Sequence, residues 1–280
     1  MARITVPDLL RMKAGNQKIA MVTAYDATMA RIVDAAEVDM VLVGDSVGMV
    51  VQGHSDTLSV TLDDMIYHAR CVDRGLERAH LTVDMPFMTY QVSSAQALEN
   101  AGRLVKEGKA QSVKLEGGAR TAPAIRAIVD AGIPVVGHVG LTPQSVHAMG
   151  GFKVQGKGDE GAAQVLADAL AVQEAGAFCV VLEMVPAELA AEVTEALSVP
   201  TIGIGAGGSC SGQVLVCNDL LGFDSRFKPR FVRRFAELET PMVEATRSYV
   251  EAVRDGSFPA IEHSFLRRGA RKGAKIARLY

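Results

Sequence analysis

One stretch of the chain, residues 81–116, reads LTVDMPFMTYQVSSAQALENAGRLVKEGKAQSVKLE. It holds a short apolar run at Leu81–Val83, a helical pattern over Ser94–Lys106 and a second apolar run at Ser112–Leu115. Short apolar runs without polar alternation are typical of parallel strands that are covered on both faces. The stretch therefore predicts a strand, a helix and a second strand parallel to the first.

The same strand–helix unit recurs on both sides of this stretch. Further strands are predicted at Ile19–Thr23, Met40–Val43, Val135–Gly137, Phe178–Leu182, Thr201–Ile204 and, as the eighth, Leu215–Cys217. Further helices are predicted at Thr28–Ala36, Asp63–Arg74, Ala122–Asp130, Glu160–Ala175 and Pro186–Leu197. About eight such units in roughly 220 residues favour a closed (β/α)8 TIM barrel. An open doubly wound sheet is the alternative, but no GxGxxG motif follows the first strand.

Segments outside the barrel are predicted at both ends of the chain. Val6–Gly15 is expected to form an N-terminal helix that closes the bottom of the barrel, and helices at Pro229–Glu237 and Pro241–Asp255 form a C-terminal extension. We expect residues 1–265 to form one catalytic domain. Residues 266–280 are basic and contain few apolar side chains, so we expect a poorly ordered tail.

Composition narrows the class of protein. The chain has 280 residues, 49% of them hydrophobic, and a net charge of −3, so it can build a large core but has no global charge for binding nucleic acid. No apolar run approaches the ~18 residues that a membrane span needs. Its four cysteines form no CxxC pair, which indicates reduced thiols and a cytoplasmic location. We expect an enzyme that acts on small molecules.

Acidic residues follow three successive predicted strands. Asp45 follows the second strand, Asp84 the third and Glu116 the fourth. In a closed barrel the carboxyl ends of all strands meet at one mouth, so these carboxylates would lie close together. Hard oxygen ligands of this kind suit Mg²⁺. The alternative is that each acid only caps the helix that follows it.

Two basic side chains are expected at the same mouth. Lys114 lies two residues before Glu116, so both point to the same face of their strand. A buried lysine requires acidic partners or an anionic ligand, so Lys114 belongs either to an ion pair or to a site for a substrate carboxylate. Nearby acids would keep its ammonium protonated, which disfavours Schiff-base chemistry. His138 ends the fifth strand and is expected to bind substrate or relay a proton, unless it is a hydrogen-bonded core histidine.

Glu183 interrupts an apolar stretch at the end of the sixth strand. Its neighbours in sequence are Leu182, Met184, Val185 and Pro186. A carboxylate desolvated among such residues has its charged form disfavoured, which raises its pKa towards that of a general base. A helix-capping role is the alternative. We therefore predict Glu183 as the catalytic base.

Ten ordered blocks of the chain together resemble the ketopantoate hydroxymethyltransferase family, over roughly Ile4 to Phe265. They are Thr23–Asp26, Val43–Gly48, Gln52–His54, Asp84–Phe87, Val113–Gly118, Gly137–Ser145, Gly150–Gly156, Leu182–Pro186, Ile202–Gly207 and Glu262–Phe265. The resemblance implies a Mg²⁺-dependent barrel of the pyruvate/phosphoenolpyruvate-utilising superfamily. It also implies transfer of a hydroxymethyl group from 5,10-methylenetetrahydrofolate to 3-methyl-2-oxobutanoate. The product would be 2-dehydropantoate, in the biosynthesis of pantothenate and coenzyme A.

The resemblance also implies roles for individual residues. Metal binding falls to Asp45, Asp84 and Glu116. Oxoacid binding falls to Asp45, Ser46, Asp84 and Lys114, and proton abstraction to Glu183. Members of this family assemble as homo-oligomers, usually decamers, so the resemblance implies the same here.

Two other functions are compatible with such a barrel. One is a Mg²⁺-dependent C–C lyase of the isocitrate lyase type, although the Lys-Lys-Cys-Gly-His loop of those enzymes is missing from the sequence. The other is a non-catalytic barrel that serves as a scaffold. The joint presence of Asp45, Asp84, Lys114 and Glu183 disfavours the scaffold.

Overall fold

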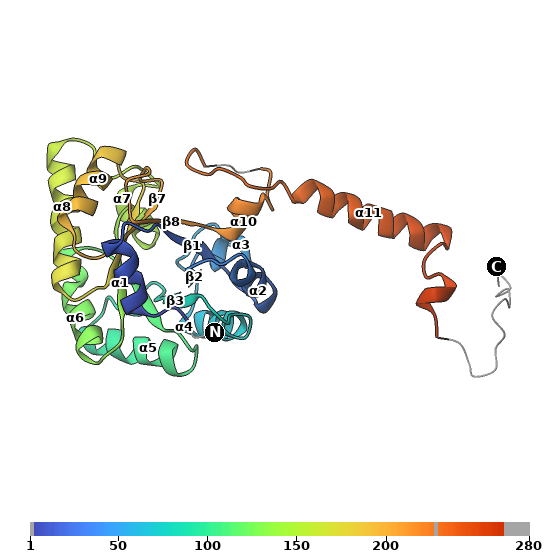
Figure 1. The fold of residues 1–280 in the computed structure, drawn as a ribbon, viewed down its shortest axis with the longest axis horizontal. Coiled ribbons are helices and arrows are strands. Elements are labelled where there is room, and N and C mark those ends of the chain that lie inside the picture. Colours follow the sequence, from blue (N-terminus) through green and yellow to red (C-terminus); the bar gives the residue numbers. More distant parts are fainter. Residues whose placement is uncertain (1–2, 227–228, 266–280) are drawn as a thin grey trace.

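Eight parallel strands close into one barrel in chain order (Figure 1). The computed structural model describes residues 3–226 and 229–265. Each strand pairs in parallel with its two neighbours, and β1 pairs with β8 to complete the ring. The strands are β1 (Ile19–Thr23), β2 (Met40–Val43), β3 (His80–Asp84), β4 (Ser112–Glu116), β5 (Val135–Gly140), β6 (Cys179–Glu183), β7 (Thr201–Ile204) and β8 (Gly212–Leu215). The predicted (β/α)8 barrel is confirmed.

The described residues form eleven α-helices, most of which surround the barrel and connect its successive strands. They are α1 (Val6–Ala14), α2 (Ala27–Ala35), α3 (Val47–Val50), α4 (Leu62–Asp73), α5 (Ser94–Lys106), α6 (Ala122–Asp130), α7 (Val146–Met149), α8 (Asp159–Glu174), α9 (Ala187–Ala196), α10 (Cys217–Leu221) and α11 (Glu239–Asp255). Short 3₁₀ turns lie at Ala119–Thr121, Pro143–Ser145 and Ile261–His263. Local sequence fixes several helix starts. Asp26, for example, accepts the backbone N–H groups of Thr28 and Met29 and so begins α2.

The core has two layers, as expected for a barrel inside a ring of helices. The larger layer lies between the outer face of the strands and the helices. The smaller layer fills the barrel interior with inward-facing side chains such as Met21, Met40 and Ile202. Leu9 and Met12 of α1 belong to this inner layer. The predicted role of the N-terminal helix, closing the barrel bottom, is therefore confirmed.

Two element predictions after β7 are wrong. The eighth strand is Gly212–Leu215 and not Leu215–Cys217, because the backbone N–H of Cys217 donates to Thr23 Oγ1 and the chain turns there into α10. A side chain at Gly212 would meet the Ile19 carbonyl oxygen at 2.3 Å, which explains a glycine at the start of this strand.

The predicted helix at Pro229–Glu237 does not form, and the described residues between this segment and α11 are not helical either. The reason is that the backbone N–H groups of Phe235 and Leu238 donate to the carbonyl oxygens of Leu220 and Leu221, at 2.9 and 3.0 Å. This segment is therefore tied to α10 instead of making its own helical hydrogen bonds.

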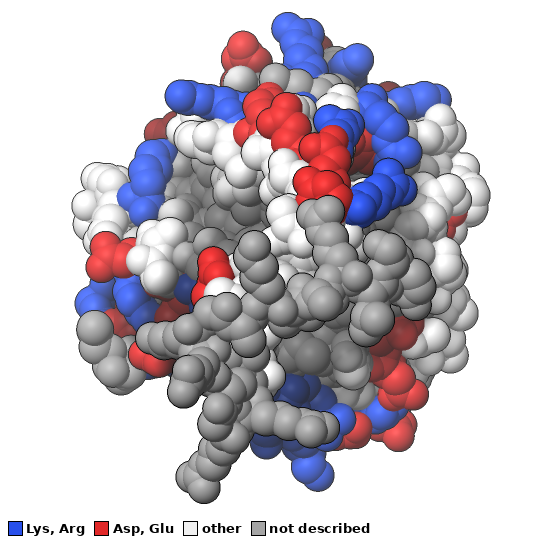
Figure 2. Space-filling view, turned by 90° about the vertical axis from the view of Figure 1, so that its right-hand side faces the viewer, with Lys and Arg blue, Asp and Glu red and all other residues white. Residues whose placement is uncertain are grey.

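The C-terminal extension leaves the barrel. Helix α11 projects away from it (Figure 1), and none of its residues is buried. On the face shown in Figure 2, acidic and basic side chains are interspersed. The predicted basic tail, residues 266–280, lies outside the described residues. Within residues 3–226 and 229–265, no helix combines the length and the apolar character needed to cross a bilayer.

His80 is a buried polar residue at the bottom of the barrel, with 1% of its surface exposed. Its Nδ1 lies 3.1 Å from the Ile4 carbonyl oxygen and its Nε2 lies 2.9 Å from Ser112 Oγ. Because a carbonyl only accepts, Nδ1 carries the proton and the ring is neutral. Burial lowers the pKa of His80 to about 4.

We predict that His80 makes folding pH-dependent. Between pH 6.5 and 4 the unfolded chain binds a proton at this residue and the folded chain does not, so stability falls as the pH drops through that window. The loss from this one group is about 3 kcal/mol, at about 1.4 kcal/mol per pH unit. Urea unfolding of wild type and His80→Asn at pH 7 and pH 4.5 measures it, with His54→Asn on an exposed loop as control. Equal pH dependence in wild type and His80→Asn would contradict the prediction.

Candidate active site

The predicted site residues gather at one end of the barrel, where the carboxyl ends of the strands form its mouth. Strand register places them side by side: Asp84 is paired with Lys114, and Glu116 with His138. Asp45 follows β2, and Glu183 ends β6 beside Gly140 of β5. Five of these residues are almost completely buried, with 2–4% exposure: Asp45, Asp84, Lys114, Glu116 and His138.

A continuous row of polar contacts crosses the mouth. Lys114 Nζ lies 3.1 Å from Asp84 Oδ1 and 3.0 Å from His138 Nδ1. On the opposite side of the imidazole ring, His138 Nε2 lies 3.2 Å from Glu183 Oε2. Since an ammonium group only donates, His138 Nδ1 is the acceptor and Nε2 carries the ring proton. The Nε2 proton therefore faces the Glu183 carboxylate.

Burial and charge set the protonation of the two basic groups. Burial alone would lower the pKa of Lys114, but the carboxylates of Asp84, Glu116 and Asp45 outweigh it and raise the pKa above its ordinary value. Burial and the Lys114 charge together lower the pKa of His138. The mouth thus holds a protonated lysine and a neutral histidine. This agrees with the prediction that the acids keep Lys114 protonated.

The buried acids at the mouth outnumber the ammonium groups beside them. Burial raises the pKa of Asp84 to about 7, and burial with the nearby Asp45 charge raises that of Glu116. Asp45, Asp84 and Glu116 have one ammonium group, Lys114, among them, and the Asp84 Oδ1 atom lacks a hydrogen bond of good geometry. Such a cluster can take up protons or hold a cation.

The donor set suits a divalent cation with oxygen ligands. Mg²⁺ keeps several water molecules and takes only one or two carboxylates from the protein. Within residues 3–226 and 229–265, no three acidic, histidine or cysteine side chains are spaced as a complete ligand set. Asp84 Oδ1 lies 3.1 Å from Lys114 Nζ without a hydrogen bond of good geometry, and its other oxygen accepts the Asp45 N–H at 3.0 Å. The carboxylates therefore fit a partly hydrated Mg²⁺.

Glu183 differs from the other acids because its side chain is 17% exposed. The prediction of a desolvated carboxylate is therefore only partly met. Glu183 is separated from Lys114 in the row by His138. Among the described residues, the neutral His138 is the polar side chain that lies beside it at the mouth. A partly exposed carboxylate with a neutral neighbour can meet a substrate and accept a proton.

Three further polar side chains at the mouth are not predicted by the sequence patterns. Gln144 and Tyr90 are buried beside Asp45 and Glu116, and the hydroxyl of Tyr25 lies 2.8 Å from that of Ser46. Gln144 and Tyr25 lie within the blocks that carry the family resemblance. Nothing in the sequence separates them from ordinary loop residues, because only the fold brings them to the acids.

Comparison with known proteins now identifies the family. The profile of ketopantoate hydroxymethyltransferase matches residues 3–261. The chain belongs to this family. A relative from Syntrophotalea carbinolica, named 3-methyl-2-oxobutanoate hydroxymethyltransferase, is 59% identical over 94% of this chain and 98% of its own. A relative of the same name from Geobacter sulfurreducens is 55% identical over 93% of this chain and 98% of its own.

Solved structures with low sequence identity share the fold. Phosphonopyruvate hydrolase superposes with a TM-score of 0.62 at 11% identity, over 96% of this chain and 92% of its own. A 2,3-dimethylmalate lyase, described as a member of the PEP mutase/isocitrate lyase superfamily, gives 0.58 at 18% identity, over 95% and 93%. These likenesses show the barrel fold, and the family profile that matches the chain is that of the transferase.

We predict that Lys114→Met strongly destabilises the fold. The substitution leaves buried carboxylates without their ammonium partner, which costs about 3–5 kcal/mol. The free energy of unfolding, measured with urea in a buffer containing a chelator, reports the loss. Arg103→Met is the matched control, because Arg103 also pairs with two acids, Asp63 and Glu107, but on the surface. Equal losses in the two variants would contradict the prediction.

Proposed function

We propose that this protein transfers a hydroxymethyl group from 5,10-methylenetetrahydrofolate to 3-methyl-2-oxobutanoate, giving 2-dehydropantoate and tetrahydrofolate with the uptake of one water molecule. The observation that carries the proposal is the shared name of relatives 54–59% identical over nearly the whole chain. The chemistry at the barrel mouth supports it. The reaction would belong to the biosynthesis of pantothenate and coenzyme A, in the cytoplasm.

The acids at the mouth would hold Mg²⁺ as the cofactor. Asp45, Asp84 and Glu116 are the residues that we assign to it, either directly or through the water molecules that the ion keeps. When bound, the ion would supply Lewis-acid chemistry, drawing negative charge on to the ketone oxygen of the oxoacid. The support is the excess of buried carboxylates over ammonium groups and the lack of a hydrogen bond of good geometry at Asp84 Oδ1.

Neighbouring side chains would bind and orient the oxoacid. We assign this to Ser46, Lys114 and His138, together with Asp45 and Asp84. The protonated Lys114 supplies the positive charge that a substrate carboxylate requires. The hydroxyl of Ser46 is held by Tyr25, which fixes its position for a hydrogen bond to the substrate.

Glu183 would act as the base. It accepts the proton from C3 of the oxoacid, and the electron pair released from that C–H bond forms the new C–C bond to the one-carbon unit. Both bonds from this carbon to folate nitrogens break, the water taken up supplies the hydroxyl oxygen, and the nitrogens leave protonated as tetrahydrofolate. The protonated Nε2 of His138 lies 3.2 Å from Oε2 of the Glu183 carboxylate, without a hydrogen bond of good geometry. Its other oxygen is then available for the proton of the substrate.

We predict that Glu183→Gln stops exchange of the C3 hydrogen of 3-methyl-2-oxobutanoate in D₂O but preserves binding of the oxoacid. An amide of the same shape cannot accept the proton, so the exchange rate should fall at least ~100-fold. Proton NMR measures exchange, and calorimetry in the presence of Mg²⁺ measures binding. Glu188→Gln, on the exposed side of α9, is the control. Exchange at the wild-type rate in Glu183→Gln would eliminate this residue as the base.

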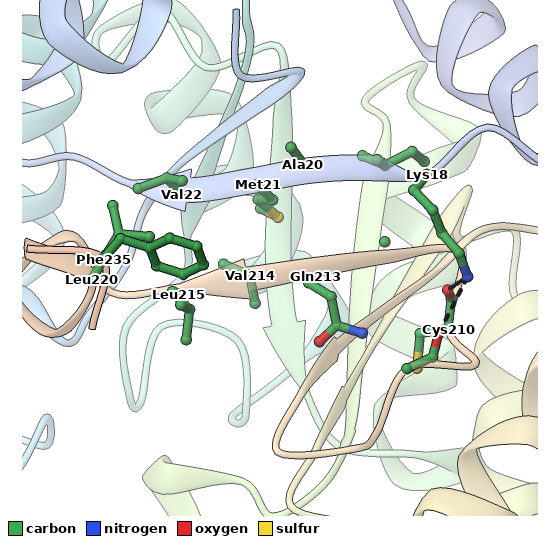
Figure 3. Close-up of a pocket in the computed structure, with 13 residues that line it drawn as sticks. Lys18, Ala20, Met21, Val22, Cys210, Gln213, Val214, Leu215, Leu220 and Phe235 are labelled. Carbon is green, nitrogen blue, oxygen red and sulfur yellow. Dashed lines mark hydrogen bonds between the residues drawn. The ribbon is translucent and has the colours of Figure 1, made fainter. Parts of the chain in front are cut away.

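Self-association is the second part of the proposed function. A groove of about 450 Å³ runs along the outer side of β1 and β8, lined by apolar side chains that include Val22, Leu215, Leu220 and Phe235 (Figure 3). In a complete barrel a helix after β8 would cover this side. Here the five-residue α10 follows β8 directly, and the long α11 points elsewhere.

Helix α11 has the surface that such a groove would bind. Met242, Tyr249 and Val253 are 46–56% exposed and recur at helical spacing, so they form one apolar stripe. We propose that α11 of one copy packs into the β1–β8 groove of another. We infer that the occupant is a second copy, because the groove that lacks a covering helix and the helix with an exposed apolar stripe belong to the same chain. By family resemblance the assembly would contain ten copies.

We predict that charge on this stripe reduces the assembly. The double variant Met242→Glu, Val253→Glu places two carboxylates where the groove is apolar and should give a particle of lower mass. Size-exclusion chromatography with light scattering measures the mass. Glu251→Lys, on the opposite face of α11, is the control and should assemble like wild type. A monomeric wild-type protein would overturn the assembly proposal.

A further inference from the structure

Gln144 is a buried polar residue at the mouth with an unusual number of partners. It lies in the 3₁₀ turn Pro143–Ser145 after β5, and only 5% of its surface is exposed. Its backbone N–H donates to Glu116 Oε2 at 3.0 Å. The turn is thereby fixed to the end of β4, and the side chain extends across the mouth towards β2.

Both ends of the side-chain amide make two hydrogen bonds each. Nε2 donates to Asp45 Oδ2 at 2.8 Å and to the Met85 carbonyl oxygen at 3.0 Å. Oε1 accepts from the Tyr90 hydroxyl at 2.6 Å and from Gln91 Nε2 at 3.2 Å. Both partners of Nε2 can only accept, so the amide has one satisfactory orientation, with its NH₂ group towards Asp45.

Tyr90 determines that orientation from the other side. Its hydroxyl is buried, accepts the Glu116 N–H at 3.1 Å and lies 2.6 Å from Gln144 Oε1. The hydroxyl proton has two acceptors, Oε1 at 2.6 Å and the Glu116 carbonyl oxygen at 3.2 Å, and the shorter distance favours Oε1. A flipped amide would place the NH₂ group against this donor, so Tyr90 keeps the donor end on Asp45.

The contact with Asp45 is suited to holding a cation ligand. An amide fixes the carboxylate through one oxygen without adding positive charge, whereas a second lysine would neutralise it and repel a cation. Met85 and Gln91 on the loop after β3 and Asp45 after β2 are thus connected through one side chain, and the backbone N–H of the same residue binds Glu116 on β4. Partners of metal ligands that fix ligand orientation typically contribute 10–100-fold to metal affinity.

We propose that Gln144 is a positioning residue, which holds the Asp45 carboxylate in the orientation for binding the divalent cation and is itself oriented by Tyr90. The inference rests on the proposed function, because it assumes that Asp45 binds the cation. Gln144 does not contact substrate in this role, and its side chain acts through Asp45.

The test is calorimetric titration of the full-length protein with Mg²⁺ in the absence of oxoacid and folate. Gln144→Met keeps the length of the side chain and removes its hydrogen bonds, so the Kd for Mg²⁺ should rise 10–100-fold. Gln164→Met is the matched control, because Gln164 also donates to an aspartate, Asp168, but on the surface of α8. This control should bind Mg²⁺ like wild type.

Tyr90→Phe provides a second variant for the case in which Gln144→Met fails to fold. It removes one hydroxyl and leaves the ring in place, and the Kd for Mg²⁺ should rise severalfold while the thermal unfolding temperature of the variant shows that it is folded. Binding at the wild-type Kd in folded Gln144→Met, or in Tyr90→Phe where only that variant folds, would overturn the inference. Wild-type protein that binds no Mg²⁺ would instead overturn the metal assignment under the proposed function.

Discussion

Three buried carboxylates that share one ammonium group are the constraint on which the mouth of this barrel depends. Asp45, Asp84 and Glu116 are each less than 5% exposed, and Lys114 is the ammonium group that lies among them. Uncompensated buried charge is costly, so the protein either protonates these acids or supplies them with a cation. Retaining such a cluster opposes folding, and its placement at the open end of the barrel is consistent with binding and chemistry.

The barrel makes this arrangement possible through its register. Residues two apart on β4 point to the same side, and pairing with β3 and β5 sets Asp84 beside Lys114 and Glu116 beside His138. The row from Asp84 through Lys114 and His138 to Glu183 thus crosses four adjacent strands. It joins the part of the mouth that suits a cation to the part that suits proton abstraction, and the neutral His138 separates the positive charge of Lys114 from Glu183.

The path of the chain after β8 leaves one side of the barrel without a covering helix. An ordinary barrel completes its outer layer with a helix after each strand, but here α10 is short and α11 leaves the barrel without burying a residue. The molecule therefore exposes two apolar surfaces. One is the groove along β1 and β8, and the other is the stripe on α11. Under the proposed self-association, α11 of one copy would cover the β1–β8 groove of another, and assembly would complete the outer layer of the barrel.

The sequence by itself determined the order of strands and helices, the closure of the barrel bottom by α1 and the acids at the mouth. It could do so because apolar runs, helical periodicity and a polar residue at the end of a buried strand are local signals. It misplaced β8 and predicted a helix near Pro229–Glu237, where contacts with β1 and α10 override local preference.

Only the tertiary structure decided which way the Gln144 amide points, which nitrogen of His138 carries its proton and how far Glu183 is exposed. Each depends on partners distant in the chain, such as Asp45 for Gln144 and Lys114 for His138. A sequence pattern carries no information on such contacts, because hydrogen-bond direction and solvent access arise only when the strands close into a ring.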